Sequence, residues 1–418
     1  MADISQSILS LLNRKIFCLG DLMLDKYVLG ATNRISPEGP IPILDVKKEV
    51  KMLGGVGNVA RNLSTLATET HLVSLLGNDS IGKEVEKKLD KINVNKNIVK
   101  DSNRPTISKS RFISNNQQIL RVDKEKVLPI SKNIEKKIFE YSKKKILKAD
   151  AVVISDYNKG LITKNILKNV ISFSKKHKKP IVVDPKNKNF ENYKGATIIT
   201  PNIKELELVV RKKLSNENEI IKYGKKLILK FNFQYLLVTL GKSGMILISR
   251  KKVFKLDAET KDVFDVSGAG DTVVSFVAAG LASSLKIEEV IRIANVAAGV
   301  VVNKSGTSVA HLSEMLISTN KNDYHLSKVM KLSEALRVTK FWYGKKEKIG
   351  FTNGCFDYLH PGHIFLFEQA KKKCSKLIVA VNSDSSIKKN KGPSRPKQKI
   401  NTRLQVLNSI PSIDLIIV

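Results

Sequence analysis

Four segments in the middle of the chain each contain a continuous apolar run that ends in polar residues or glycine. They are AVVISDYNKG (151–160), PIVVDPKN (180–187), GATIITPNIKEL (195–206) and YLLVTLGKSGMILI (235–248), and lysine-rich helical stretches separate the first three. Strands that are apolar at every position are typical of parallel sheets with helices on both faces. The pattern therefore predicts an α/β fold built on a parallel sheet.

Polar side chains follow these runs, and we expect them at one rim because the carboxyl ends of parallel strands meet at the same edge. They are Asp156, Lys159, Asp184, Lys186, Asn202 and Glu205. Asn202 and Glu205 are three residues apart after a strand, so they can face one way. Such a pair can hold a magnesium-water shell or nucleotide phosphates.

The segment DVSGAGDTVVSFVAAG (Asp265–Gly280) predicts an anion site. A strand-like lead (263–266) enters a turn with Gly268 and Gly270, and a small-residue apolar helix follows. Glycines let a backbone approach an anion closely, and the amides at a helix start suit a phosphate in transfer. Asp271 is then placed to take a proton from a substrate hydroxyl. The alternative is an ordinary helix start whose acidic residue complements the helix dipole.

Near the N-terminus, KIFCLGDLMLD (Lys15–Asp25) predicts a buried strand that ends at Gly20. Asp21 follows that end, where ligands of open α/β sheets gather, so it is a candidate to hold sugar hydroxyls. Capping of a turn is the simpler role. The next stretch (27–53) alternates apolar and polar residues and carries Pro and Gly, which indicates short twisted strands of a projecting flap.

A second junction between glycines and a helix occurs in GGVGNVARNLSTLA (Gly54–Ala67), with Asn58 and Arg61 in the first helical turns. One such junction is commonly structural. Two such junctions in one chain make a purely structural role less favoured.

The segment RPTISKSRFISNNQQILRVD (Arg104–Asp123) alternates like a hairpin and contains Arg104, Arg111 and Arg121, a quarter of the twelve arginines. The planar guanidinium matches phosphate geometry. As a set, these arginines favour recognition of a substrate phosphate, although any single one can be a surface charge.

The motif of Gly241, Lys242 and Ser243 resembles the end of a P-loop, but the position of the required earlier glycine is Leu236. The sequence therefore argues against a Walker-type NTPase.

The net charge of +34 does not by itself indicate a nucleic-acid partner. Only 12 of the 73 basic residues are arginine, and the lysines are scattered in short runs along predicted helices such as 133–148 and 222–230. Aromatic residues make up 6% of the chain and do not interleave with the basic runs, as stacking on single strands requires. The charge favours solvated lysine-rich faces and attraction for phosphorylated small molecules, without nucleic acid.

The chain of 418 residues, 42% of them hydrophobic, is long enough for two or three globular domains. No apolar window reaches the length of a membrane span, and the N-terminus lacks the basic region of a secretion signal. Cys18, Cys355 and Cys374 have neither the number nor the spacing of a disulfide framework or a zinc site. We expect a soluble cytoplasmic protein with reduced thiols, no membrane partner and no structural metal.

The C-terminal part predicts a second unit. Residues 319–346 form a polar lead and one amphipathic helix, a linker between a first domain (1–318) and a last one (347–418). The last stretch begins KIGFTNGCFDYLHPGHIFLFEQAKKKCSKLIVAVNSD, which has the order strand, loop, helix, strand. His360 and His363 bracket Pro and Gly at the helix start, where amides and imidazoles can stabilise charge on an α-phosphate.

The motifs GDLMLD, SPEGPIPIL, GGVGNVARNL, RPTISKSR, SDYNKG, TPNIKE and DVSGAGD, in this order, resemble the ribokinase (PfkB) family of sugar kinases. GGVGNVARNL with SPEGPIPIL is most similar to the kinase half of the bifunctional heptose 7-phosphate kinases and heptose 1-phosphate adenylyltransferases. TNGCFDYLHPGH resembles the HxGH nucleotidyltransferase signature of the same enzymes. The resemblance implies a ribokinase-like three-layer sandwich with a small β flap, followed by a partial Rossmann-like nucleotidyltransferase domain.

The resemblance also implies the reaction and the roles of residues. ATP with Mg²⁺ phosphorylates D-glycero-D-manno-heptose 7-phosphate at C1 to the 1,7-bisphosphate, adenylyl transfer gives ADP-heptose for the lipopolysaccharide core, and the enzyme is a homodimer. The residues implied are Asp271 as catalytic base; Gly268, Ala269 and Gly270 as anion hole; Asn202, Ile203, Lys204 and Glu205 at ATP and magnesium; Asp21, Gly55, Asn58 and Arg61 near the sugar; and His360 and His363 in the second domain.

The sequence ends at Val418 inside a predicted strand (IDLIIV), before the later strands and the phosphate-binding motif of the nucleotidyltransferase family. We therefore expect an intact kinase and weak or missing adenylyl transfer. Two alternatives stay open. One is another PfkB sugar or nucleoside kinase with a vestigial C-terminal domain, and the other is a nucleic-acid or scaffold protein with an inactive kinase fold.

Overall fold

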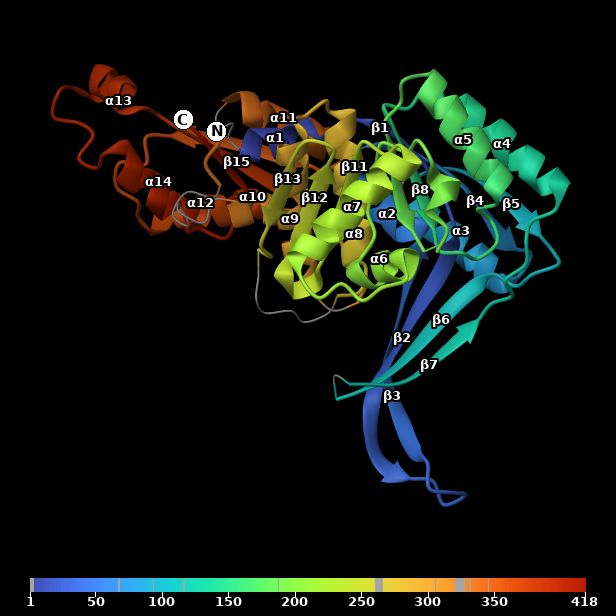
Figure 1. Cartoon of the computed structure of the whole chain (residues 1–418). Coiled ribbons are helices and arrows are strands. Elements are labelled where there is room, and N and C mark those ends of the chain that lie inside the picture. Colours follow the sequence, from blue (N-terminus) through green and yellow to red (C-terminus); the bar gives the residue numbers. More distant parts are fainter. Residues whose placement is uncertain are drawn as a thin grey trace. The chain divides into compact units, whose positions relative to one another are not determined.

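The computed structural model of the chain describes residues 4–418 except 67, 93, 116, 187, 260–265, 305, 320–327, 331 and 345. By its internal contacts the chain divides into two compact units (Figure 1). The larger one comprises Asn13–Leu312, and the smaller one comprises Met1–Leu12 with Ser313–Val418.

A central sheet forms the larger unit, and nine of its strands lie in the described ranges, in the order β13-β12-β11-β10-β9-β8-β1-β4-β5. The strands from β11 through β5 in that order run parallel. The bounds are β1 (Lys15–Gly20), β4 (Glu69–Gly77), β5 (Asn95–Asp101), β8 (Ala151–Asp156), β9 (Ile181–Pro185), β10 (Ile198–Ile199), β11 (Tyr235–Thr239), β12 (Met245–Ser249) and β13 (Val253–Leu256).

The parallel arrangement expected for 235–248 is wrong in its second half. This segment forms two strands, β11 and β12, which pair antiparallel around a short 3-10 turn, Gly241–Ser243. Gly241 and Gly244 have positive φ angles of 60° and 85°, which allow the chain to reverse there. The motif that resembled a P-loop is therefore the tip of a hairpin.

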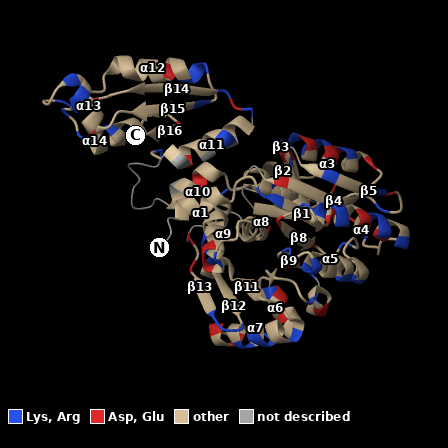
Figure 2. Ribbon diagram, turned by 90° about the horizontal axis from the view of Figure 1, so that it is seen from above, with Lys and Arg blue, Asp and Glu red and all other residues tan. Residues whose placement is uncertain are grey.

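Helices cover both faces of this sheet, which confirms the ribokinase-like three-layer sandwich (Figure 2). On one face, α8 packs against β1, β8 and β9, and α2 and α9 pack on α8. On the other face, α4 packs on β1, β4 and β5, α5 packs on α4, and α7 covers β11 and β12. The helices of this unit are α2 (Val56–Ser64), α3 (Ser80–Lys91), α4 (Lys132–Ile146), α5 (Lys164–Lys176), a 3-10 turn (Phe190–Tyr193), α6 (Ile203–Val210), α7 (Glu217–Phe231), α8 (Ala269–Ala282) and α9 (Ile287–Val302).

The apolar runs become buried strands because both faces are covered. Every residue of β8 and β9 is buried. Helix α8 is buried at each position from Asp271 to Gly280, as its apolar, small-residue sequence requires. A Cβ at Gly280 would lie 2.8 Å from both methyl groups of Val290, so this glycine sets the close packing of α8 on α9. Figure 2 shows Lys and Arg interspersed with Asp and Glu on α3, α4 and α7.

The flap consists of four strands in the order β3-β2-β6-β7, which extend from the sandwich (Figure 1). They are β2 (Leu22–Ile35), β3 (Pro42–Gly55), β6 (Ile107–Ser114) and β7 (Gln117–Lys124). The expectation of short strands is wrong for β2 and β3, which have 14 residues each. Their pairing continues through two irregularities of register, between Leu29 and Gly30 and between Thr32 and Arg34, so neither irregularity ends the strands.

The smaller unit contains a parallel three-stranded sheet in the order β14-β15-β16 within the described residues. Helix α11 lies in the predicted linker and packs against α1, β14 and β16 of this unit. The predicted domain boundaries at 318 and 346 stay predictions. The elements are α1 (Ile4–Ser10), α10 (Leu312–Thr319), α11 (Leu332–Gly344), β14 (Ile349–Gly354), α12 (Pro361–Lys372), β15 (Lys376–Val381), α13 (Asp384–Lys391), α14 (Ile400–Asn408) and β16 (Leu415–Ile417).

Across the described ranges, none of the helices combines the length and the apolar character needed to span a membrane.

Candidate active site

The start of α8 has the geometry of an anion cradle. Gly268 precedes the helix in the left-handed conformation, with φ 82°, and no side chain of the described residues caps this end. Backbone N–H groups in a first helical turn have no partner within the helix. Around Gly270, a Cβ would meet no atom of the described residues within 4 Å. The strand-like lead expected at 263–266 lies mostly in 260–265, outside the described residues.

A cavity of about 570 Å³ lies in front of this turn. It brings the turn of Gly268, Ala269 and Gly270 together with the α6 start, where Asn202, Ile203, Lys204 and Glu205 line it. The hairpin tip and one side of α9 complete the wall: Thr239, Leu240, Gly241, Lys242, Gly244, Met245, Asn295, Ala298, Gly299 and Val302. Sequence reasoning did not assign these last residues to a site, because their contribution depends on how α9 and the hairpin pack.

Asp271 lines the cavity and is 4% exposed. Its Oδ2 accepts a hydrogen bond from Asn58 Nδ2 at 2.9 Å, and its Oδ1 accepts one from the Tyr157 hydroxyl at 2.9 Å. Burial, with repulsion from Asp184, raises the pKa of Asp271 to about 7. A carboxylate with a pKa near neutral pH is suited to accept a proton from a hydroxyl.

A partly buried charge cluster lines the same cavity at the end of β9. The Lys186 ammonium lies 3.2 Å from Asp184 Oδ1 and 2.8 Å from Glu205 Oε1. Asp184 is 2% exposed. Burial opposes the charge of Lys186, but the two carboxylates outweigh it and raise the lysine's pKa. Lys186 therefore remains a cation inside the cavity, where it can contact phosphate.

Asn202 and Glu205 form a capping box at the start of α6. The Asn202 side chain accepts from the Glu205 N–H at 2.9 Å, and Glu205 Oε2 accepts from the Asn202 N–H at 2.8 Å. Burial raises the pKa of Glu205, although Lys186 opposes the shift. Both residues line the cavity, and part of their hydrogen-bonding capacity holds the helix end.

Asp21 is buried where β1 ends. Its Oδ2 accepts from the backbone N–H groups of Tyr157 at 3.0 Å and Lys159 at 3.1 Å. Its side chain thus holds the loop after β8. Burial and repulsion from Asp156 raise the pKa of Asp21 to about 7.

Helix α2 presents two further predicted residues to this region. Asn58 contacts Asp271, and Arg61 donates to the carbonyl oxygen of Thr307 at 2.6 Å and to Asn58 Oδ1 at 3.4 Å. Gly55 precedes the helix with φ 59°, and a Cβ there would lie 2.3 Å from the Asp21 carbonyl oxygen. The second glycine junction thus allows β3 and α2 to approach Asp21 closely.

The three arginines of segment 104–123 do not form one cluster: Arg111 and Arg121 are cross-strand partners in β6 and β7, whereas Arg104 lies in the turn before β6. Arg104 is buried, and its guanidinium donates to Asp101 at 2.7 Å and to two backbone carbonyls. Arg111 donates to Asp25 at 2.6 Å and lies 5.3 Å from the centre of the Tyr27 ring. The Arg121 side chain is half exposed and pairs with Asp123. Binding of a substrate phosphate by Arg104 and Arg111 stays a prediction.

The donors in the cavity fit a magnesium ion held mainly by nucleotide phosphates. The described residues contain no group of three or more His, Cys, Asp or Glu that could enclose a metal. Mg²⁺ instead keeps several waters and needs only one or two protein carboxylates beside phosphate oxygens. Asn202 and Glu205, fixed by their capping box, are suited to hold such waters.

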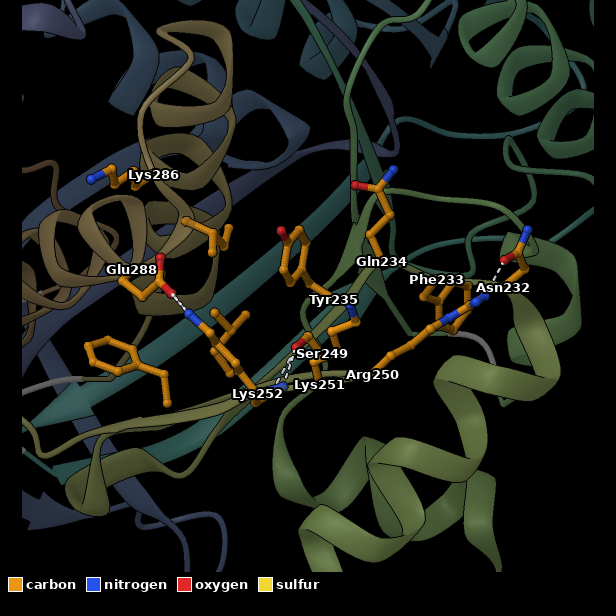
Figure 3. Close-up of a pocket in the computed structure, with 13 residues that line it drawn as sticks. Asn232, Phe233, Gln234, Tyr235, Ser249, Arg250, Lys251, Lys252, Lys286 and Glu288 are labelled. Carbon is orange, nitrogen blue, oxygen red and sulfur yellow. Dashed lines mark hydrogen bonds and ion pairs between the residues drawn. The ribbon is translucent and has the colours of Figure 1, made fainter.

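A second cavity, of about 620 Å³, lies at the other end of β11 (Figure 3). Arg250 donates to Asn232 at 2.7 Å, and Lys252 lies 4.0 Å from Glu288. Lys286, which precedes α9, also lines this cavity. None of the predicted site residues, all of which are described, belongs to its lining.

In the smaller unit, His360 and His363 lie at the start of α12, where Pro361 is the first helical residue. The two rings stack at 3.9 Å between centroids with 34° between their planes, and no side chain caps the helix. Burial and the neighbouring His360 lower the pKa of His363. This arrangement agrees with the expected strand, loop and helix.

Two residues that sequence reasoning did not single out fix this loop. Arg403 of α14 is 1% exposed and donates to Asp384 at 2.6 Å and to the Cys355 carbonyl at 2.6 Å. Asp357 accepts from Arg395 at 2.7 Å and from two backbone N–H groups. Arginine is rare in this chain, and its use at position 403 was the available signal.

Comparison with known proteins identifies the family. The family model described as "pfkB family carbohydrate kinase" matches residues 13–314, and a "cytidylyltransferase-like" model matches residues 351–418. Bifunctional protein HldE of Paramagnetospirillum magneticum is 40% identical over 407 residues, which cover 96% of this chain and 83% of that protein. Its counterpart in Pasteurella multocida is 41% identical over 404 residues, 96% and 84% of the two chains.

The chain belongs to the PfkB carbohydrate kinases and, among them, to the bifunctional HldE proteins. It is a sugar kinase with a cytidylyltransferase-like C-terminal domain. Solved structures agree with this PfkB fold. Phosphofructokinase-2 from Escherichia coli, in complex with potassium, matches with a TM-score of 0.62 at 20% identity, covering 73% of this chain and 98% of that one. Arabidopsis thaliana ribokinase, complexed with ribose and ATP, matches with a TM-score of 0.60 at 20% identity, covering 74% and 99%.

Proposed function

We propose that this PfkB enzyme transfers the γ-phosphoryl group of ATP to the anomeric hydroxyl of D-glycero-D-manno-heptose 7-phosphate, giving the 1,7-bisphosphate. One observation carries the proposal: a buried carboxylate, Asp271, directly follows the glycine turn, and both line one cavity. The motifs that resemble the heptose branch and the likeness to the HldE proteins support the choice of sugar.

The residues of the cavity divide the work of the reaction. The amides of the α8 start hold the γ-phosphoryl group, and Lys186 and Lys204 lie on the path of the other phosphates. Asp271 takes the proton of the sugar hydroxyl while the oxygen of that hydroxyl bonds to the γ-phosphorus. The bond from that phosphorus to the β-phosphate oxygen breaks, and ADP leaves. Positioning and charge stabilisation supply most of the acceleration, and the base contributes about 10²–10⁴-fold.

We assign sugar binding to Asp21 and Asn58. Asn58 donates to Asp271, and Asp21 holds the loop that carries Tyr157 and can accept from sugar hydroxyl groups. When bound with ATP, Mg²⁺ neutralises phosphate charge, and Asn202 with Glu205 would hold its water shell.

A coupled ADP-release assay tests the proposal. We expect rapid ADP formation with heptose 7-phosphate and much slower formation with heptose, fructose 6-phosphate, ribose or adenosine. Equal or faster turnover of a sugar without the 7-phosphate would indicate a different PfkB kinase. No turnover with any of them would favour a scaffold role.

We propose adenylyl transfer to heptose 1-phosphate, which gives ADP-heptose for the lipopolysaccharide core, as the activity of the C-terminal domain. The stacked His360 and His363 at an uncapped helix start support it, because such groups can stabilise an α-phosphate under attack. Release of pyrophosphate from ATP with heptose 1-phosphate tests this activity. The expectation that it is weak stays a prediction, which robust product would contradict.

We also propose a homodimer formed through the flap in the cytoplasm, where its donor ATP is found. The flap strands carry exposed apolar side chains, which favour association. They include Ile35, Val46, Ile119, Leu120 and Val122. Light scattering on the purified chain tests the assembly, and Leu120→Lys should shift it toward the monomer.

A further inference from the structure

Tyr157 joins the two carboxylates of the kinase site. Its backbone N–H donates to Asp21 Oδ2 at 3.0 Å, and its hydroxyl donates to Asp271 Oδ1 at 2.9 Å. The residue therefore contacts both the group proposed to hold the sugar and the group proposed to accept its proton. Sequence reasoning considered the Asp and Lys of SDYNKG and passed over the tyrosine between them.

The loop that carries Tyr157 is fixed on both sides. The Asp156 side chain accepts from the Asn158 N–H at 2.8 Å, and Asn158 has a positive φ of 56°. The Lys159 N–H donates to Asp21 at 3.1 Å. The Lys186 ammonium lies 5.5 Å from the centre of the Tyr157 ring, within the range of a cation–π contact. With its backbone and ring held, the hydroxyl has a defined position.

We propose that Tyr157 is a positioning residue whose hydroxyl holds Asp271 in the ionised form and the orientation needed to accept the sugar proton. The inference rests on the proposed role of Asp271 as the base. A carboxylate with one donor on each oxygen has a fixed plane, and each oxygen keeps a lone pair for a substrate hydroxyl. Asn58 from α2 fixes one oxygen, and Tyr157 from the loop after β8 fixes the other.

The charges around Asp271 give this hydroxyl a measurable effect. Burial and Asp184 raise the pKa of Asp271, whereas the hydrogen bonds from Asn58 and Tyr157 and the charge of Lys186 lower it. Other charged groups that line the cavity are Lys204, Glu205, Lys242 and Glu259, and Arg61 of α2 contacts Asn58. Removing the hydroxyl removes a donor to the ionised form, so the pKa of Asp271 should rise further.

Tyr157→Phe removes this hydroxyl with little change in volume. The chain offers a matched control, because Tyr193 is fully buried and its hydroxyl donates to the buried Asp156 at 2.6 Å, away from Asp271. The titration midpoint of Asp271 would be followed by carboxyl ¹³C NMR on full-length protein with labelled aspartate, with Asp271→Asn to assign the signal. The pH profile of kcat/KM for heptose 7-phosphate would be measured in parallel.

We expect Tyr157→Phe to move the Asp271 midpoint and the acid limb of kcat/KM upward together. A midpoint one pH unit higher would lower the ionised fraction, and with it kcat/KM, about tenfold near pH 6.5. Tyr193→Phe should leave both in place. An unchanged midpoint in Tyr157→Phe, or an equal change in Tyr193→Phe, would overturn the inference. If the unmodified enzyme showed no turnover, the proposed function would be refuted. The inference about Tyr157 would still be tested, because the NMR midpoint of Asp271 is measured without substrate.

A second variant provides the same test if Tyr157→Phe folds poorly. Site-specific 3-fluorotyrosine at position 157 retains the ring and makes the hydroxyl a stronger donor. The Asp271 midpoint should then move downward, the opposite direction from Tyr157→Phe. A midpoint that stays in place or moves upward would contradict the positioning role.

Discussion

The central sheet carries a cavity at each end of β11, and the two differ in the burial of their charges more than in size. One, of about 570 Å³, meets the end of β11 at Thr239, and the other, of about 620 Å³, meets its start at Tyr235. The first contains Asp271 and Asp184, which are 4% and 2% exposed. In the second, the Lys252 side chain is 81% exposed.

This difference shows why cavity volume is a poor guide to chemistry here. Burying a carboxylate costs free energy unless partners compensate, so a fold that keeps two of them in one cavity has a use for them. Exposed lysines cost little and are abundant in this chain. Only the first cavity combines an uncapped glycine turn with buried ionisable groups.

The comparison is tested most strongly by Asp271→Asn. We expect kcat to fall by about 10²–10⁴-fold, because the amide cannot take the sugar proton, while heptose 7-phosphate still binds. ADP release gives the rate, and calorimetric titration gives the binding. The matched change in the second cavity, Glu288→Gln, should leave both values unaltered. Normal turnover by Asp271→Asn would remove the carboxylate from the mechanism.

Gly270→Ala should follow, with a loss of about 10²-fold in kcat. The added methyl group meets no atom of the described residues within 4 Å, so we expect it to protrude into the space for the phosphoryl group without disturbing the fold. Gly344→Ala is the control, since a Cβ there is equally free of neighbours and lies at the end of α11. If Gly270→Ala kept full activity at an unchanged melting temperature, the phosphoryl group would have to bind elsewhere.

Stability should depend on pH through the same buried carboxyl groups. The folded-state pKa values of Asp21 and Asp271 are raised from 3.8 to about 7, so the folded protein binds protons more tightly than the unfolded chain. Their contribution to the free energy of unfolding therefore grows as the pH falls from 7 toward 4. Asp271→Asn, which cannot ionise, should raise the melting temperature by a few degrees at pH 8 and by less at pH 5. A fixed difference across this range would argue against the raised pKa, and Glu288→Gln should show no such trend.

Local patterns predicted those parts of the fold that depend on local sequence. The apolar run of segment 151–160 forms β8, and the small-residue helix expected after Gly268 and Gly270 is α8. The glycines at the start of α8 indicated an anion site from sequence alone, because glycine determines the conformation of its own stretch of backbone. In contrast, the antiparallel pairing of β12 follows from a turn whose direction the apolar run does not show.

Contacts between residues far apart in the sequence could not be predicted from local patterns. Tyr157 and Asp271 are 114 residues apart, and their hydrogen bond exists only because α8 packs on the end of β8. Arg104 likewise looked available for phosphate, yet its guanidinium is occupied by Asp101 and backbone carbonyls. Residue type and spacing suggest chemistry, whereas burial and partners decide which groups are free to perform it.

The smallest effect is expected from reversing charge in the second cavity. Lys286→Glu removes one of its cations, and the position is exposed, so the free energy of unfolding should change by less than about 0.5 kcal/mol. The kcat and the KM for ATP should stay within about twofold, because long-range effects of an exposed charge are screened. Lys204→Glu is the matched reversal in the first cavity, also at an exposed lysine, and it should raise the KM for ATP several-fold through repulsion of phosphate. If both variants changed the KM for ATP equally, charge at either end of β11 would affect ATP binding alike, and the two cavities would not differ as described.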